Sequence, residues 1–416
     1  MNDLFFVFSE VASRYGELAA AFFATLFFSM LFGCPRKFLF LSGLNGFIAW
    51  FTYLFVFKLT ASLVFANFWA TSAVAVFAQI ISLKRRVPLD VFLVPGIFVL
   101  VPGATIYKMF FAFISHFDKT AFLLFKETVS IGFSIAMAIF IFVFIFEILN
   151  KAVISRYRTQ ENTRACPVSA ESAFLAAVDI GRLMLESGSE THKVEETIDT
   201  FCRVNGLNKI QSFVIPTGII ATLLERKNHP LTELVRVSKR SLDLGKLAAI
   251  MDALTNYYMQ KIYYSDLIEK LNKIKTMVIY KKYEQYLSAA FAVACFSVLF
   301  AGGVNEFFAS MAIGFLAQIL VERFSFLQFP AQLINLLVSA SICLMATALV
   351  RYACFCSADI LIVSSIMILV PGVTVINALR EIIAGDLVSG SARGFDALIV
   401  AASIASGVGV TLKIIF

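Results

Sequence analysis

The sequence predicts an all-α polytopic membrane protein with one water-soluble insert, and three observations lead to this fold class. Of the 416 residues, 59% are hydrophobic and 15% are charged, against roughly 45–50% and about 25% in soluble domains. Residues 151–286 hold 35 of the 63 charged side chains, whereas long apolar runs fill the remainder. We therefore expect a membrane block over residues 1–150, a soluble domain over 151–286 and a second membrane block over 287–416.

Each membrane block contains five apolar runs that approach the roughly 20 residues a helix needs to cross the hydrocarbon core. In each block the fourth run is interrupted by Pro-Gly. The sequence thus predicts about ten transmembrane helices, five in each block. The runs are Leu18–Phe32, Phe38–Phe57, Ala61–Leu83, Val91–Ile114, Ala121–Leu149, Leu287–Val304, Phe307–Leu320, Leu333–Val350, Ile360–Ile383 and Leu398–Phe416.

Basic residues between the runs predict the orientation in the membrane. Residues 36–37 (Arg-Lys) follow the first run, residues 84–86 (Lys-Arg-Arg) follow the third, and Lys151 comes directly after the fifth. Because Lys and Arg are enriched in cytoplasmic loops, these connections and the insert are expected in the cytoplasm, with the N-terminus outside. Three lysines then fall on the external side, against the general bias: Lys108, Lys119 and Lys126.

Short sequence matches predict that the two blocks are repeats. Leu100–Ile106 returns as Leu369–Val375, with five of seven residues identical at an offset of 269. Phe28–Phe32 returns as Phe296–Phe300 at an offset of 268. Because five spans place the second block in the opposite orientation, the blocks are expected to be inverted repeats, an arrangement that many secondary transporters use.

The two Pro-Gly breaks are the strongest candidates for a binding site. Proline removes a backbone donor and glycine permits a sharp change of direction, so a half-helix starting at Gly103 or Gly372 can point its N-terminal amides at an anionic group. A packing kink explains one isolated break, but a break in both blocks favours a site. The residues expected to bind substrate are Pro102, Gly103, Thr105, Pro371, Gly372, Thr374, Asn377 and Arg380.

The insert is expected to be mainly helical with a small β portion. Ala170–Glu186 has an apolar helical face, and Ser189 can cap a second helix that ends near Val204. Ile210–Leu224 is β-branched and interrupted at Pro216-Thr217-Gly218, which predicts a strand pair. Leu231–Lys275 is expected to form one or two helices that lead back to the membrane.

Acidic residues gather where the first two insert helices meet, and further polar groups follow the second Pro-Gly break. We expect these groups to gate the cytoplasmic mouth of a transporter, although helix capping and solvated helix faces by themselves explain most of the acidic residues, and a solvated loop explains the polar stretch after the break equally well. A membrane-embedded hydrolase using Glu190 and Glu195 is an alternative, but no nucleophile–base set accompanies them. The candidate gating residues are Glu186, Glu190, Thr191, Glu195, Asp386 and Arg393.

The composition indicates neither a metal site, nor a cofactor, nor a nucleic-acid partner. The seven cysteines lie mostly in apolar runs, and the three histidines are widely separated. The net charge of +7 comes from the insert and from short clusters beside apolar runs, where it sets membrane orientation. Membrane lipid is the expected environment, and the sequence is compatible with a homo-oligomer.

Several of these motifs resemble the threonine/serine exporter family. Residues from about 169 to 416 are similar to the larger component of its two-component form, and residues 1 to about 150 to the smaller one. The order is reversed relative to the usual fused members, Asn305 stands at a position expected to be acidic, and Glu381 at one where aspartate is commoner. The matching motifs are Gly181–Thr191 with Val194-Glu195, Val214–Gly218, Leu369–Thr374 with Asn377-Ala378, Gly385–Gly390, Arg393 and Phe32–Pro35.

The resemblance implies a secondary transporter in the cytoplasmic (inner) membrane of a bacterium. It implies export of threonine and serine that is coupled to protons and driven by the proton motive force. Two-component members are linked to succinate, so a dicarboxylate is the alternative substrate. A passive channel is a further alternative that the residues leave open.

Overall fold

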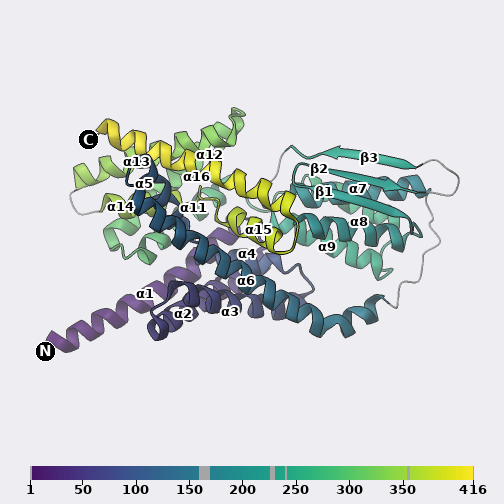
Figure 1. Ribbon diagram of the computed structural model, residues 1–416, viewed down its shortest axis with the longest axis horizontal. Coiled ribbons are helices and arrows are strands. Elements are labelled where there is room, and N and C mark those ends of the chain that lie inside the picture. Colours follow the sequence, from purple (N-terminus) through teal and green to yellow (C-terminus); the bar gives the residue numbers. More distant parts are fainter. Residues whose placement is uncertain (1, 159–168, 225–229, 239–240, 354–356, 416) are drawn as a thin grey trace.

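The computed structural model describes residues 2–158, 169–224, 230–238, 241–353 and 357–415, and within these α-helices dominate (Figure 1). Each membrane block contributes six helices, because the fourth predicted run is divided in two at its Pro-Gly break. The first block comprises α1 (Asn2–Leu31), α2 (Leu39–Thr60), α3 (Leu63–Arg85), α4 (Asp90–Phe98), α5 (Gly103–Ile114) and α6 (Asp118–Arg158). The second block comprises α11 (Lys282–Leu299), α12 (Val304–Phe326), α13 (Ala331–Ala353), α14 (Ala358–Ile366), α15 (Gly372–Ile383) and α16 (Leu387–Ile415).

Six helices in the described residues are long and apolar enough to cross a membrane: α2, α3, α6, α12, α13 and α16. The pair α4–α5, bent by 52°, makes a seventh if it counts as one span. The expected ten are not reached by this criterion. The described apolar part of α1 is short (Tyr15–Leu31), α11 begins with the polar segment Lys282–Tyr286, and α14 and α15 are separate short helices of 9 and 12 residues.

The insert is an α+β unit formed by α7 (Ala170–Glu186), α8 (Thr191–Val204), β1 (Ile210–Ile215), β2 (Gly218–Leu223), β3 (Leu231–Arg236), α9 (Leu244–Tyr258) and α10 (Tyr264–Lys275). The strands form an antiparallel sheet in the order β1-β2-β3. Helix α8 contacts β1, and α7 contacts β2 and β3, which encloses a core that includes Phe174, Phe201 and Tyr257. The predicted first helix and the strand pair are therefore confirmed.

Two details of the insert differ from expectation. Leu231–Arg236 is a strand rather than the start of a helix, because its alternating side chains pair with β2 along the whole strand. The helix α8 starts at Thr191 with Glu190 as its N-cap, so the expected cap Ser189 lies one residue outside. The remaining part of the predicted helical segment forms α9 and α10.

The two broken helix pairs run in opposite directions relative to the insert. Helix α4 begins at Asp90, whose carboxylate meets Lys193 of the insert at 2.8 Å, and α5 then leads away. Helix α15 instead ends near the insert, because Arg380 meets Glu190 at 2.7 Å. Figure 1 shows α4 and α15 beside the insert, and α5 and α14 at the other end of the molecule.

The two Pro-Gly breaks pack directly on each other. A Cβ atom on Gly103 would meet Val370 Cγ1 and Met367 Cε at 3.0 Å, and one on Gly372 would overlap the Val101 side chain. Each break also has the same turn, in which the glycine amide donates to a valine carbonyl two residues earlier, at 2.7 Å for Gly103 and 2.8 Å for Gly372. The breaks thus form one close interface at the centre of the fold.

Candidate functional site

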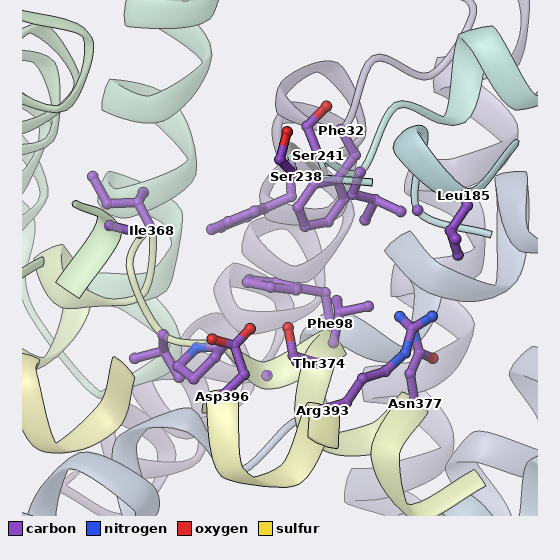
Figure 2. A pocket seen from close by; sticks show the side chains of 18 residues that line it. Phe32, Phe98, Leu185, Ser238, Ser241, Ile368, Thr374, Asn377, Arg393 and Asp396 are labelled. Carbon is purple, nitrogen blue, oxygen red and sulfur yellow. The ribbon is translucent and has the colours of Figure 1, made fainter. Parts of the chain in front are cut away.

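A cavity of about 410 Å³ lies beside the second break, on the side that faces the insert. A volume of this size is typical of small-molecule sites, which fall in the range of roughly 300–1,000 Å³. The second block supplies most of its wall, the first block supplies three phenylalanines, and the insert supplies the rest, including two serines (Figure 2). We call it the inner cavity; it is lined by the break residues Val370–Thr374 and by Phe28, Phe32, Phe98, Leu185, Gly188, Ser238, Ser241, Leu242, Ala331, Ile368, Asn377, Arg393 and Asp396.

Four polar side chains form one wall of the inner cavity. Thr374 and Asn377 lie three residues apart on α15, and Arg393 and Asp396 lie three residues apart on α16, so each pair shares a helix face. Figure 2 shows them along one edge, with Phe98 and Phe32 facing them. The amide oxygen of Asn377 is buried and has no hydrogen-bond partner among the described residues. This wall therefore offers a cation, an anion, a hydroxyl and an unsatisfied amide to one ligand.

The N-terminus of α15 also opens into this cavity. Pro371 is its N-cap, and the Gly372 amide is already taken by the carbonyl of Val370. The expected free amide of Gly372 is thus engaged, and the next first-turn amides, those of Val373 and Thr374, are the ones that a helix leaves without an internal partner. Both residues line the cavity, so a carboxylate placed there would meet two N–H donors and the positive end of the helix dipole.

Arg393 is the buried cation of the site. Its side chain is 10% exposed and lies 3.0 Å from a carboxylate oxygen of Glu381, which is 6% exposed. A second nitrogen donates to the backbone oxygen of Ser189 in the insert at 3.2 Å. Arg393 therefore connects α16, α15 and the insert, and it also faces the inner cavity, although its expected role was in gating.

The first break lies outside the inner cavity. Pro102 and Gly103 are buried, and Thr105 is half-buried. None of the three lines the cavity, because Gly103 faces Met367 and Val370 across the interface between the breaks. The first break supports the wall from behind, whereas Pro371, Gly372, Thr374 and Asn377 of the expected binding set form it.

Arg380 instead belongs to a chain of ion pairs between the insert and both blocks. It meets Glu190 at 2.7 Å, Glu190 meets Lys193 at 3.5 Å, and Lys193 meets Asp90 of α4 at 2.8 Å. All four line a neighbouring cavity of about 540 Å³ between α8, α9 and the membrane helices. This ion chain fixes the insert on the break regions of both blocks.

The other candidate gating residues hold the insert in place in different ways. Thr191 donates to Asp386 at 2.8 Å, which links the start of α8 to the start of α16. Glu195 accepts the Val214 amide at 2.8 Å and joins α8 to β1, and Glu186 lies 3.9 Å from Arg182 on its own helix. Each of the two carboxylates of the hydrolase alternative, on Glu190 and Glu195, thus has a structural partner, and the described residues contain no cluster of three or more His, Cys, Asp or Glu that could hold a metal.

Comparison with known proteins identifies the family. A family model for the threonine/serine exporter matches residues 176–415, and a second model, "Threonine/Serine exporter, ThrE", matches residues 17–145. The first match alone covers more than half of the chain. The chain belongs to the threonine/serine exporter family. Its two components are fused, with the smaller one first, as the motifs indicated.

Two curated relatives of this exporter-family chain carry the name "Probable succinate transporter subunit YjjP". The protein from Klebsiella aerogenes is 26% identical over 216 residues, which cover 50% of this chain and 81% of the relative. The protein from Escherichia coli (strain K12) is 23% identical over 242 residues, covering 57% and 92%. No solved structure matches the chain. The relatives and the family are transporters rather than enzymes, and the apolar helices agree with a multi-pass membrane protein.

Sequence reasoning missed several residues that the fold brings to the site of this family member. Asp396 was not singled out, although it follows Arg393 by three residues on the same helix. Ser238 and Ser241 come from the insert, and only the docking of the insert places them at the inner cavity. Lys193 and Asp90 were likewise not identified, because their pairing joins segments 103 residues apart.

The ion chain leads to a prediction about pH and stability. Burial alone would raise the pKa of Glu190, but the charges of Arg380, Lys193 and Arg393 outweigh it and lower the pKa to about 2. A carboxylate with a lowered pKa stabilises the folded state above its ordinary pKa of about 4.5, and this contribution is lost as the pH falls towards the folded-state value. Glu190→Gln should therefore lower the unfolding temperature at neutral pH, and by a shrinking amount as the pH falls below about 4.5.

Thermal unfolding of the purified protein between pH 3.5 and 8 measures this difference. Glu196→Gln is the matched control, since Glu196 lines the same cavity but forms no ion pair with the described residues. A difference between wild type and Glu190→Gln that does not shrink as the pH falls below about 4.5 would contradict the assignment.

Proposed function

We propose that the chain is a secondary transporter that exports small polar metabolites bearing a carboxylate, in the first place threonine and serine. The proton motive force would drive export across the bacterial cytoplasmic membrane. One observation carries the proposal: Thr374, Asn377, Arg393 and Asp396 line one cavity at the N-terminus of a half-helix. Paired helix breaks of this kind are typical of substrate sites in secondary transporters.

The chemistry of this wall matches a free α-amino acid. The substrate carboxylate would lie at the amides of Val373 and Thr374 and near Arg393, since charge-assisted hydrogen bonds to carboxylates are among the strongest. The ammonium group would face Asp396, and the substrate hydroxyl would reach Asn377. Phe32 and Phe98 on the facing wall would exclude water and strengthen these contacts.

The inverted repeat and ten-span arrangement belong to the same proposal. In support of it, α13 (Ala331–Ala353) begins and ends 268 residues after α3 (Leu63–Arg85), and α15 lies 269 residues after α5. Contacts are also reciprocal: Gly103 faces Val370 while Gly372 faces Val101, and α5 packs on α16 while α15 packs on α6. Reciprocal contacts between equivalent residues are typical of a two-fold relation. Helices α1 and α11 also contact each other through equivalent residues, since the ring centroids of Phe28 and Phe296 lie 5.4 Å apart.

Alternating access would then involve movement at the interface between the two breaks, with the insert on the cytoplasmic side. The ion chain of Asp90, Lys193, Glu190 and Arg380 connects the insert to both blocks, and Thr191 with Asp386 adds a further link. We propose that these contacts gate the cytoplasmic mouth, because they must rearrange if the blocks move relative to each other.

Succinate is the second candidate substrate, and the names of the curated relatives favour it. A dicarboxylate has no ammonium group to pair with Asp396, and a second carboxylate near Asp396 would be repelled. Asp396→Asn should therefore reduce serine and threonine transport at least about tenfold and leave or improve succinate transport, since a tenfold step corresponds to about 1.4 kcal/mol and a hydrogen bond to a charged group contributes about 1.5–3 kcal/mol. Competition of each substrate with labelled serine measures the change.

A matched control for Asp396→Asn is Asp118→Asn, at the start of α6 and outside the lining of the inner cavity. The amino-acid assignment is contradicted if Asp396→Asn lowers succinate and serine transport by the same factor.

Counterflow tests the function itself. Proteoliposomes with purified protein are loaded with unlabelled substrate and offered labelled threonine, serine or succinate outside. Accumulation of a labelled amino acid supports the proposal, whereas accumulation of succinate alone transfers it to the dicarboxylate. A proton uncoupler then separates a coupled carrier from a passive channel, because only the carrier loses uphill export when the proton gradient collapses.

A further inference from the structure

A third cavity, of about 420 Å³, lies at the end of the membrane blocks opposite the insert. Helices α5 and α14, which supply most of its wall, occupy that end in Figure 1. We call it the outer cavity; it is lined by Tyr107, Lys108, Phe111, Phe300, Asp359, Ile360, Ile362, Val363 and Leu412.

Some residues of the outer cavity are sequence counterparts, at the offsets between the two blocks, of residues in the inner cavity and in the neighbouring cavity that contains the ion chain. Phe300 of the outer cavity is the counterpart of Phe32 in the inner cavity at the offset of 268, and Lys108 is the counterpart of Asn377 at 269. Phe111 and Leu412 likewise correspond to Arg380 and Val143 of the cavity next to it. Of these four lining residues, two thus have counterparts in the inner cavity and two in the cavity next to it, as expected if the repeat relates the two ends of the membrane blocks.

Two opposite charges stand in an otherwise apolar outer cavity. Lys108 projects from α5 and Asp359 from the start of α14, and both are exposed. Lys108 forms no ion pair or hydrogen bond with the described residues. A lysine at this end also runs against the preference for Lys and Arg on the cytoplasmic side, so membrane orientation does not account for it.

We propose that the outer cavity is the release-side binding site for the same class of ligand, a free α-amino acid in its zwitterionic form. Lys108 receives the carboxylate and Asp359 the ammonium group, while Tyr107, Phe111 and Phe300 enclose the rest. This rests on the proposed export function. The inner cavity likewise holds one cation and one anion, Arg393 and Asp396, although these two residues are not the counterparts of Lys108 and Asp359 in the repeat.

Cysteine labelling tests this site directly. Lys108→Cys, in a variant without the seven native cysteines, is treated in intact cells with a membrane-impermeant methanethiosulfonate reagent. We expect labelling from outside that saturating threonine or serine slows at least about fivefold, while succinate at the same concentration has little effect. Lys119→Cys is the control: it lies at the same end, at the start of α6, and should be labelled without protection.

Transport provides an independent readout. Lys108→Ala should raise the KM for external threonine about tenfold in counterflow, the effect of about 1.4 kcal/mol from one lost charge-assisted contact, with the KM from the cytoplasmic side unchanged. Lys108→Arg should retain most of the external affinity, which separates loss of charge from misfolding.

The outcomes separate this site from the function on which it rests. Absence of counterflow by the wild-type protein would contradict the export function. Normal counterflow together with unprotected Lys108→Cys and an unchanged external KM in Lys108→Ala would overturn the outer site alone. Lack of labelling from outside would overturn it as well, because the cavity would then not face the exterior.

Discussion

Replacing Arg393 with alanine is expected to reduce counterflow of threonine and serine by about 100-fold or more. Arg393 is the buried cation on the polar wall of the inner cavity, and removal of one partner of a buried, hydrogen-bonded charge pair typically costs about 2–5 kcal/mol. A substrate carboxylate would keep the amides at the start of α15 but lose the guanidinium. Initial rates in proteoliposomes at several substrate concentrations measure the loss.

The same substitution leaves Glu381 without its cation, and this needs a control. An unpaired carboxylate that is 6% exposed is expected to destabilise the fold by about 3–5 kcal/mol. Arg393→Ala combined with Glu381→Gln removes both charges and should restore folding without restoring transport. Arg393→Lys should retain part of the activity, and Arg351→Ala, at an exposed arginine of α13, should have no effect. A folded double variant with near-normal transport would refute the role of Arg393.

Replacing Gly372 with alanine is expected to disturb the interface between the two breaks and to lower transport at least about tenfold. The added Cβ would overlap the Val101 side chain, and overpacking in a close-packed core typically costs about 1–3 kcal/mol. Because Gly372 begins α15, any shift that relieves the overlap also displaces Thr374 and Asn377. Gly103→Ala should be milder, since its nearest neighbours include the flexible end of Met367.

A second substitution tests the cause of the Gly372→Ala defect. Val101→Ala removes the methyl groups that the new Cβ would meet, so the double variant should recover both unfolding temperature and transport. Gly394→Ala on α16 is the matched control, because its Cβ would meet only Ala378, at 4.0 Å. Failure of Val101→Ala to improve Gly372→Ala would show that the glycine is needed for another reason.

The parts of the fold that the sequence predicted have strong local signals. The Pro-Gly pairs divide a helix in both blocks because proline and glycine act on the backbone directly, and α7 matches its predicted bounds because Ser169 caps its start and a glycine follows its end. The strand β3 was missed because a segment of only six residues, Leu231–Arg236, is too short for hydrophobic periodicity to distinguish a strand from a helix. The boundaries of elements were therefore predictable where proline, glycine or a capping residue sets them locally.

The site was only partly predictable because it depends on how separate helices are rotated against each other. Thr374 and Asn377 follow directly from the break. Arg380 lies three residues beyond Asn377, yet it meets the insert rather than the inner cavity, since Glu190 offers it a partner there. Arg393 and Asp396 complete the wall only because α16 packs against α15. No local sequence pattern predicts how these two helices are rotated relative to each other.

The contact between Phe28 and Phe296 has a consequence for the origin of the protein. These two residues are counterparts in the proposed repeat, and their rings touch. A residue that meets its own counterpart is what a single ancestral chain would produce on pairing with an oppositely inserted copy of itself. In such an ancestor every substitution would have altered both ends of the pathway together. In the proposed repeat, duplication would have removed that constraint, so that Asn377 and Lys108 could diverge and the two ends could come to differ in their affinity for the substrate.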